Sequence, residues 1–171
     1  QIVQNSTFVK GVTQKGFEVL YLTEPIDEYV VQQLKDYDDH KLVSITQEGL
    51  DLPEETQVKE QFEQLKTDFE PLCAKVKEIL KDRVEKVTLS NRLVDDPLCV
   101  VTGQHGWSSN MERIMKAQAL GDKNMMAYMM SKKNVELNPH NVIIKSIRER
   151  IDNTEEQNSI SSLVTLLYDS A

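Results

Sequence analysis

A tryptophan and a group of methionines are the side chains with the clearest capacity for binding. All six methionines lie between Met111 and Met130, and the only tryptophan, Trp107, lies just before them. Methionine is unbranched and polarizable, so a surface rich in it adapts to many apolar partners. A partly exposed amphipathic hairpin within residues 106–133 would bind other polypeptides in this way. The alternative is that these methionines fill the core of their own domain.

Two short helical segments are expected to carry these side chains. Ser109 and Glu112 fit a capping box, which predicts a helix over residues 110–120. The apolar face of that helix holds Met111, Ile114 and Met115. A second segment follows Gly121 and holds Met125, Met126, Tyr128, Met129 and Met130. If this segment is helical, its methionines span an arc too wide for a single contact with a small core.

The sequence lacks the residue patterns of a metal centre or a nucleophilic active site. The three histidines, His40, His105 and His140, are far apart and have no ligand partners at metal-binding spacing. The two cysteines, Cys73 and Cys99, show no CxxC spacing and no nucleophile context. We therefore predict no catalytic residue and no metal site.

Two loop motifs also favour turns over catalysis. Gly103-Gln104-His105-Gly106 lacks the glycine pattern and the lysine of a phosphate-binding loop. Asp95 and Asp96 precede Pro97, an arrangement typical of a solvated turn. A small α/β enzyme, the third interpretation considered, would need a pocket with several titratable groups of shifted pKa.

The composition describes one sizeable domain, or a domain with part of another, and limits its partners. Of the 171 residues, 39% are hydrophobic, which is enough for a core. The net charge of −8 would repel a phosphate backbone, so no nucleic acid is expected as a partner. No apolar run reaches the roughly 20 residues of a membrane span, and residues 1–20 do not resemble a signal peptide, so no membrane is expected either. Two cysteines are too few for a disulfide framework and favour a reducing, cytoplasmic location.

Residues 1–52 alternate short helical and extended patterns. Residues 17–21 and 41–45 are typical of strands, and Pro25 opens a helix between them. The apolar positions of that helix are Ile26, Tyr29, Val30, Leu34 and Tyr37. Strand, helix and strand in this order predict a parallel, right-handed crossover. Because two strands are too few for a stable sheet, we expect this part to begin inside a larger domain.

Residues 53–81 predict a long, charged helix with apolar residues at alternating spacings of four and three. These residues are Val58, Phe62, Leu65, Phe69, Leu72, Val76 and Ile79. The spacing suits an amphipathic helix packed on its own domain, and it also suits the seam of a coiled coil. Pro71 removes one backbone hydrogen bond, so a kink or a break is expected near Glu70. The coiled-coil alternative would make the chain a self-associating scaffold or adaptor.

The remaining patterns predict a short mixed sheet and further helices. Residues 84–93, 97–101 and 135–137 have the alternation or the apolar runs of strands. Asn138 and Pro139 suit the cap and the first turn of a helix. Its inner face holds Ile143, Ile144, Ile147 and Ile151. A last helix has an apolar face broad enough to need a partner surface: Ile160, Leu163, Val164, Leu166, Leu167 and Tyr168. The predicted fold class is mixed α/β (α+β).

Several motifs resemble the Hsp90 family of molecular chaperones, and the likeness covers essentially the entire chain. The first is Leu-Tyr-Leu-Thr-Glu-Pro-Ile-Asp-Glu-Tyr (20–29). The second is Val-Glu-Lys-Val (84–87) followed by Ser-Asn-Arg-Leu-Val (90–94). The third is Gly-Trp-Ser-Ser-Asn-Met-Glu-Arg-Ile-Met-Lys-Ala-Gln-Ala-Leu (106–120). Lys-Lys (132–133) and Glu-Leu-Asn-Pro (136–139) extend the match.

The resemblance implies a segment of an ATP-dependent chaperone. Residues 1–52 would be the C-terminal α/β part of the middle domain, and residues 53–171 the C-terminal dimerisation domain, truncated at its end. ATP and Mg belong to the family's N-terminal domain, so no cofactor and no ATPase activity are expected in this segment. The implied partners are client proteins, co-chaperones and, in the full-length protein, a second copy forming a homodimer.

The same resemblance implies two sets of site residues. The client-binding set lies on the amphipathic hairpin: Trp107, Met111, Met115, Met126, Tyr128 and Met129. The dimerisation set lies on a helix over residues 159–171: Ile160, Leu163, Val164 and Leu167.

Overall fold

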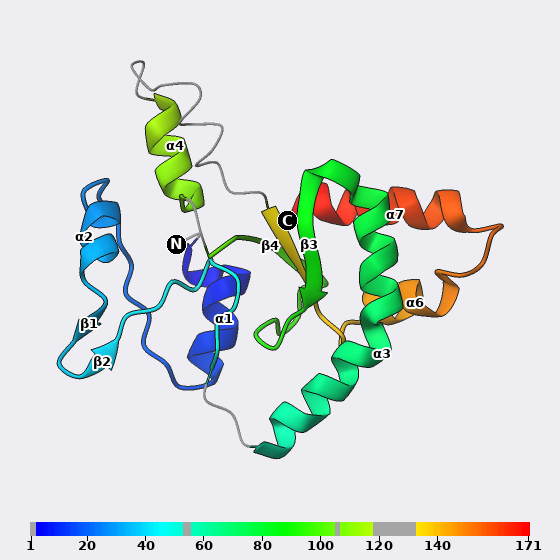
Figure 1. The fold of residues 1–171 in the computed structure, drawn as a ribbon, viewed down its shortest axis with the longest axis horizontal. Coiled ribbons are helices and arrows are strands. Elements are labelled where there is room, and N and C mark those ends of the chain that lie inside the picture. Colours follow the sequence, from blue (N-terminus) through cyan, green and yellow to red (C-terminus); the bar gives the residue numbers. More distant parts are fainter. Residues whose placement is uncertain (1–2, 53–55, 105–106, 118–132) are drawn as a thin grey trace.

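The computed structural model describes residues 3–52, 56–104, 107–117 and 133–171 (Figure 1). Helices and short strands are interspersed along the chain, which confirms the predicted mixed α/β class. The elements are η1 (Val3–Asn5), α1 (Thr7–Gln14), α2 (Asp27–Gln33), β1 (Asp36–Tyr37), β2 (His40–Lys41), α3 (Thr56–Leu80), η2 (Lys81–Arg83), β3 (Val84–Leu89), β4 (Leu98–Thr102), α4 (Ser109–Ala117), β5 (Lys133–Leu137), α6 (Val142–Arg150) and α7 (Gln157–Ser170).

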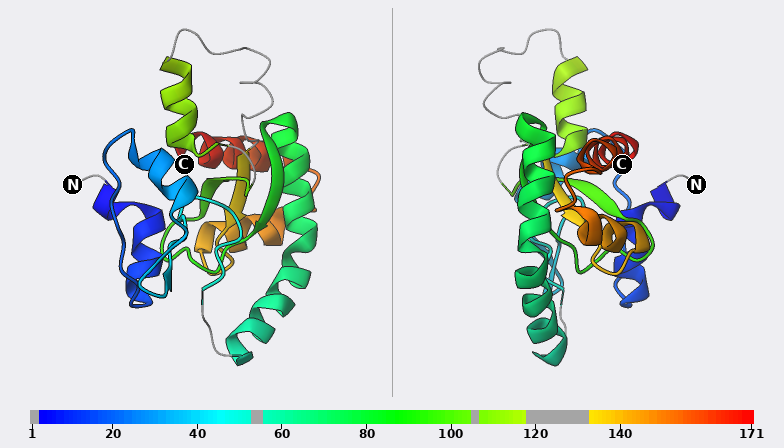
Figure 2. Two further views of the ribbon diagram at one scale, coloured as in Figure 1. Left: turned by 60° about the vertical axis from the view of Figure 1, so that its left-hand side comes forward. Right: turned by 90° about the vertical axis from the view of Figure 1, so that its right-hand side faces the viewer.

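A three-stranded sheet in the order β3-β5-β4 lies between two groups of helices. The central strand β5 pairs in parallel with β3, with a register shift between Val84 and Lys86, and antiparallel with β4. Helices α3, α6 and α7 lie on one side of the sheet and α1 on the other (Figures 1 and 2). All residues of β5 after Lys133 are buried, as expected for a strand covered on both faces.

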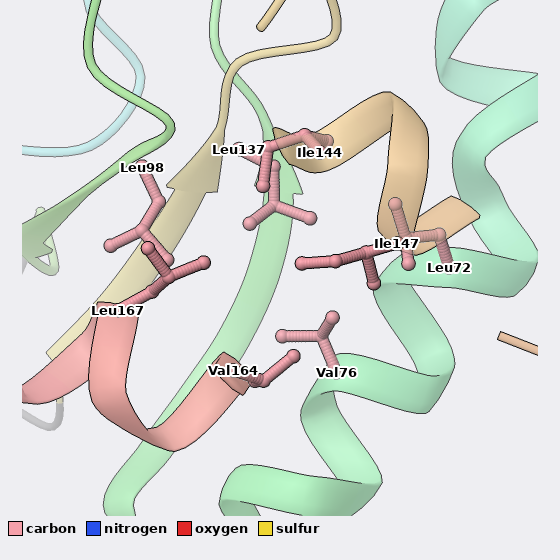
Figure 3. A pocket seen from close by; sticks show the side chains of 8 residues that line it. All are labelled: Leu72, Val76, Leu98, Leu137, Ile144, Ile147, Val164 and Leu167. Atoms are coloured by element: carbon pink, nitrogen blue, oxygen red, sulfur yellow. The ribbon is translucent and has the colours of Figure 1, made fainter. Parts of the chain in front are cut away.

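The hydrophobic core lies between the sheet and helices α3, α6 and α7. Figure 3 shows eight apolar side chains that point toward a common centre: Leu72, Val76, Leu98, Leu137, Ile144, Ile147, Val164 and Leu167. The space left among them is about 10 Å³. This volume is far too small for a ligand, so the region is a packed core rather than a binding pocket.

Helix α3 runs continuously through Pro71, so of the kink or break predicted near Glu70 the break does not form. Its axis changes direction along its length (Figures 1 and 2). Pro71 and Thr67 are both exposed, so water can replace the hydrogen bond that proline cannot donate. Neither α3 nor any other helix in the described part of the chain has the length and apolar content needed to cross a bilayer.

Arg92 joins the N-terminal segment to the other face of the sheet, and sequence reasoning did not single it out. Its side chain is buried and donates to both carboxylate oxygens of Glu136 on β5, with Nε 2.8 Å from Oε2. It also donates to the backbone oxygens of Ile45 at 2.7 Å and Gln47 at 3.1 Å. The guanidinium carbon lies 5.6 Å from the ring centre of Phe8 on α1. The Arg92 guanidinium therefore links α1, residues 45–47 and β5.

Close backbone contacts accompany this ion pair. A Cβ at Gly11 on α1 would lie 1.8 Å from the Arg92 carbonyl oxygen, so only glycine fits there. Beside β4, the Thr102 N–H donates to the Thr46 oxygen at 3.2 Å. The Thr102 oxygen accepts from the Glu48 N–H at 2.9 Å. The N-terminal segment thus has polar contacts with the sheet in addition to the buried apolar side chains Val9, Val12 and Leu52.

The predicted strand-helix-strand crossover within residues 1–52 is not formed. The helix exists as α2, but residues 17–23 have no regular structure, and only the two-residue β2 represents the second strand. β2 pairs antiparallel with β1 across Asp38 and Asp39, whose φ angles of 48° and 61° suit a tight hairpin turn. A strand needs a neighbour for its backbone groups, and residues 17–21 find none among the described residues. Leu20 consequently stays 70% exposed.

Strands β3, β4 and β5 and helices α6 and α7 confirm the predictions for the rest of the chain, apart from one helix cap. Asn141, not Asn138, caps α6, since its side-chain oxygen accepts from the Ile143 N–H at 2.8 Å. Asn138 is instead buried and donates to the backbone oxygens of Val94 and Asp96. The helix therefore starts later than predicted, and Ile143 is partly exposed rather than on the inner face.

Candidate functional site

Trp107 and helix α4 form the described part of the predicted binding hairpin. Trp107 lies just before α4, separated from it by Ser108, and is partly exposed. Relative to the other described elements, the helix projects away from the sheet, and its C-terminal end lies farthest from them (Figures 1 and 2). Ile114 and Met115 on this helix are also partly exposed. An indole and a thioether near the surface of a projecting helix can contact an apolar segment of another chain.

Met111 does not share this exposure. Its side chain is only 3% exposed, so it is packed inside the protein and is not accessible to a partner. The interpretation that the methionines fill the core therefore holds for Met111. It does not hold for Met115, whose side chain is partly accessible. Helical spacing placed both residues on one apolar face, but the two side chains differ in burial.

The first turn of α4 is capped by Ser108 and not by the predicted pair. The Ser108 hydroxyl accepts from the Met111 N–H at 3.0 Å, one residue earlier than the capping box required. Glu112 does not reach back to the helix start. It is buried and accepts from the Lys133 ammonium, with both carboxylate oxygens at 3.1 Å. This ion pair ties the start of α4 to the start of β5.

Glu28 of α2 is a second contact of α4 that sequence reasoning missed. Its carboxylate accepts from the Ser108 hydroxyl at 2.8 Å and from the Asn110 side-chain amide at 2.7 Å. The sequence showed Glu28 only as an acidic residue in the first turn of its own helix. No local spacing connects positions that are 80 residues apart, so no sequence signal could have found this contact.

The remaining residues of the predicted client-binding set, Met126, Tyr128 and Met129, lie outside the described residues, as do Met125 and Met130. The dimerisation set is divided. Ile160 and Val164 belong to the buried core, whereas Leu163 and Leu167 are partly buried against it. The most exposed apolar side chain of α7 is Leu166, at 64%.

Both cysteines are thiols with little nucleophilic character. Burial, with a smaller contribution from the charge of Glu70, raises the pKa of Cys73 to about 11. Burial, followed by the charge of Glu136, raises the pKa of Cys99 to about 12. Among the described residues, no three His, Cys, Asp or Glu side chains lie close enough together to hold a metal ion.

We expect Cys73 and Cys99 to resist alkylation by iodoacetamide at pH 8 in the native protein. A thiolate is the reacting species, and the raised pKa of Cys99 lowers its thiolate fraction about a thousandfold relative to a thiol of ordinary pKa 9.0. Mass spectrometry of the labelled protein, with and without denaturant, measures the effect. Native labelling as fast as labelling in denaturant would contradict it.

Comparison with known proteins gives one consistent family. The chain matches the family described as Hsp90 protein over residues 1–171. It is 52% identical, over 99% of its length, to heat shock protein HSP 90-beta-3 of Homo sapiens and covers 28% of that protein. It is 46% identical, over 99% of its length, to heat shock protein 83 of Leishmania donovani and covers 37% of it. It is 43% identical, over 98% of its length, to heat shock protein 90-5, chloroplastic, of Arabidopsis thaliana and covers 21% of it. The chain therefore spans well under half the length of these relatives.

Proposed function

The chain belongs to the Hsp90 family, and from this premise we propose that it is a client-contacting segment of a molecular chaperone. The proposed contact surface consists of Trp107 and the exposed side of α4 with Met115. By family resemblance, the proposed client-contacting set also includes Met126, Tyr128 and Met129, which lie outside the described residues. Met111 belongs to its buried support.

The observation that supports this proposal is the partial exposure of Trp107 beside a projecting helix. A buried tryptophan would serve only the core, whereas an accessible indole offers a large, rigid apolar surface to a partner. Met115 adds an adaptable side chain, which suits the recognition of many unrelated sequences. The net charge of −8 keeps such an apolar surface compatible with solubility.

The test is to replace Trp107 and Met115 together, as Trp107→Ser with Met115→Gln. The probe is a fluorescein-labelled polypeptide kept unfolded by reduced, carboxymethylated cysteines. Aromatic anchors often contribute about 2 kcal/mol or more, so Kd measured by anisotropy should rise by roughly tenfold or more.

A matched control is Val142→Ser on α6, which removes an apolar side chain that is 77% exposed but lies away from α4. This variant should leave Kd unchanged. Thermal melts of all variants should coincide with that of the wild type. Unchanged probe affinity in the Trp107 and Met115 variant would overturn the proposal.

We also propose that α7 contributes to a homodimer in the full-length protein. Ile160 and Val164 belong to the core of their own chain, and Leu163 and Leu167 are partly buried against it, so Leu166 is the apolar side chain of α7 most available to a second copy. The predicted dimerisation set of Ile160, Leu163, Val164 and Leu167 stays a prediction. We further propose that the full-length protein hydrolyses ATP through a domain outside this segment and that it binds co-chaperones. Residues 1–52 would belong to the middle domain of the family and residues 53–171 to its C-terminal dimerisation domain.

We propose a cytoplasmic location on the basis of the two cysteines. Both cysteines are present as thiols, as expected in a reducing compartment. The relative named chloroplastic shows that the family also has organellar members.

A further inference from the structure

Helix α4 is held at its first turn by two opposite charges from different parts of the chain. On one side, the Glu28 carboxylate accepts from Ser108 and Asn110 at 2.8 and 2.7 Å. On the other side, the Lys133 ammonium donates to buried Glu112 at 3.1 Å. Lys133 belongs to the central strand of the sheet, whereas Glu28 belongs to α2. The orientation of α4 therefore depends on the positions of two elements, not one.

The link through Glu28 joins α4 to a helix that, in the described part of the chain, is only loosely packed. Its seven residues include no buried side chain, and Tyr29 and Val30 are 46% and 45% exposed. The Ser108 hydroxyl that donates to Glu28 also accepts from the Met111 N–H, so the same atom caps α4. A carboxylate beside the N-terminal end of a helix is also favoured by the helix dipole. Movement of α2 would thus act directly on the cap of α4.

We propose that Glu28 is a positioning residue that couples α2 to the orientation of α4 and of Trp107. When α2 keeps Glu28 on Ser108 and Asn110, the first turn of α4 is fixed in the observed position. When Glu28 withdraws, α4 keeps the tie to Lys133, but Ser108 and Asn110 lose their shared acceptor and the first turn of the helix becomes less ordered. The coupling stands on geometry alone, and only its effect on client binding rests on the proposed function.

The test uses Trp107 as a reporter, since it is the only tryptophan and lies next to Ser108. Glu28→Ala removes a charge-assisted acceptor of two hydrogen bonds, so amide exchange in residues 109–117 should become about tenfold faster. Acrylamide should also quench Trp107 more strongly. Glu28→Gln keeps a carbonyl oxygen for Asn110 and an amide group for Ser108, so it should restore most of the wild-type exchange rate.

Two controls separate coupling from a general loss of stability. Glu18→Ala removes one exposed carboxylate from the same segment and should change neither signal. In a double-mutant cycle, Asn110→Ala removes part of the partner surface, so adding Glu28→Ala should have less effect than it has in the wild type. The proposal would be overturned if the two substitutions multiplied the exchange rate independently of each other. It would also be overturned if Glu28→Ala had the exchange rates and the Trp107 quenching of the wild type.

Binding of the unfolded probe described above separates this inference from the proposed function. Faster exchange in Glu28→Ala with weaker probe binding supports both. Faster exchange with unchanged probe binding supports the coupling and counts against α4 as the client surface. Weaker probe binding without any change in exchange or quenching would contradict the coupling, because Glu28 would then act on the probe directly.

Discussion

Replacement of Arg92 by leucine is expected to lower the free energy of unfolding by about 3–5 kcal/mol. Glu136 is only 7% exposed and would remain as a buried carboxylate without its cation. The backbone oxygens of Ile45 and Gln47 would lose their donor at the same time. Urea denaturation followed by circular dichroism measures the change.

Two further variants show whether the unpaired charge is the cause. Arg92→Leu combined with Glu136→Leu removes both charges and should recover a large part of the lost stability. Arg150→Leu breaks an exposed pair with Glu156, 3.2 Å apart, and should cost less than about 1 kcal/mol. If Arg92→Leu were as mild as Arg150→Leu, the interpretation of Arg92 as the link between the N-terminal segment and the sheet would be wrong.

Replacement of Phe69 by alanine is expected to cost about 3–5 kcal/mol. The ring is 2% exposed in the core, and the guanidinium carbon of Arg148 lies 4.3 Å from its centre. Alanine would leave a cavity and remove this cation–π contact. Chemical denaturation measures the change, and Val58→Ala, which is 46% exposed on the same helix, should cost less than about 1 kcal/mol.

This comparison also separates the two interpretations of the long helix. In a coiled coil, Val58 and Phe62 would be as important as Phe69, because each belongs to the same seam. Full burial begins at Phe69, and Phe62 and Leu65 are partly buried against the same core, which favours a helix packed on its own domain. Light scattering of Phe62→Glu tests the scaffold alternative, because an assembly that depends on the seam would dissociate. We expect the molar mass to stay that of the wild type.

Elements with strong local patterns could be predicted from the sequence. The apolar spacing of α3 and the alternation of β3 depend on residues close in the chain, and both elements formed where expected. The segment 17–21 has an equally good strand pattern but forms no strand. A strand is completed by a neighbour, so its existence depends on distant residues that a local pattern does not contain.

The sequence predicted the residue types of the candidate site but not the contacts that position them. Composition identified Trp107 and the methionines as unusual, and the structure places Trp107 and Met115 partly at the surface. The contacts that position α4 come from Glu28 and Lys133, which are distant in sequence from the residues they bind. Helical spacing alone also could not distinguish exposed Met115 from buried Met111, since both fit the same apolar face.

The place of β5 at the centre of the sheet has a consequence for the order of folding during synthesis on the ribosome. β3 and β4 emerge first, yet each pairs within this sheet only with β5, which is made about 30 residues after β4 ends. Until residues 133–137 leave the exit tunnel, β3 and β4 lack the strand that lies between them, and the native backbone pairing open to β4 is that of Thr102 with Thr46 and Glu48. A nascent chain halted before that point would expose two unpaired edges, the condition in which a growing protein itself needs protection from aggregation.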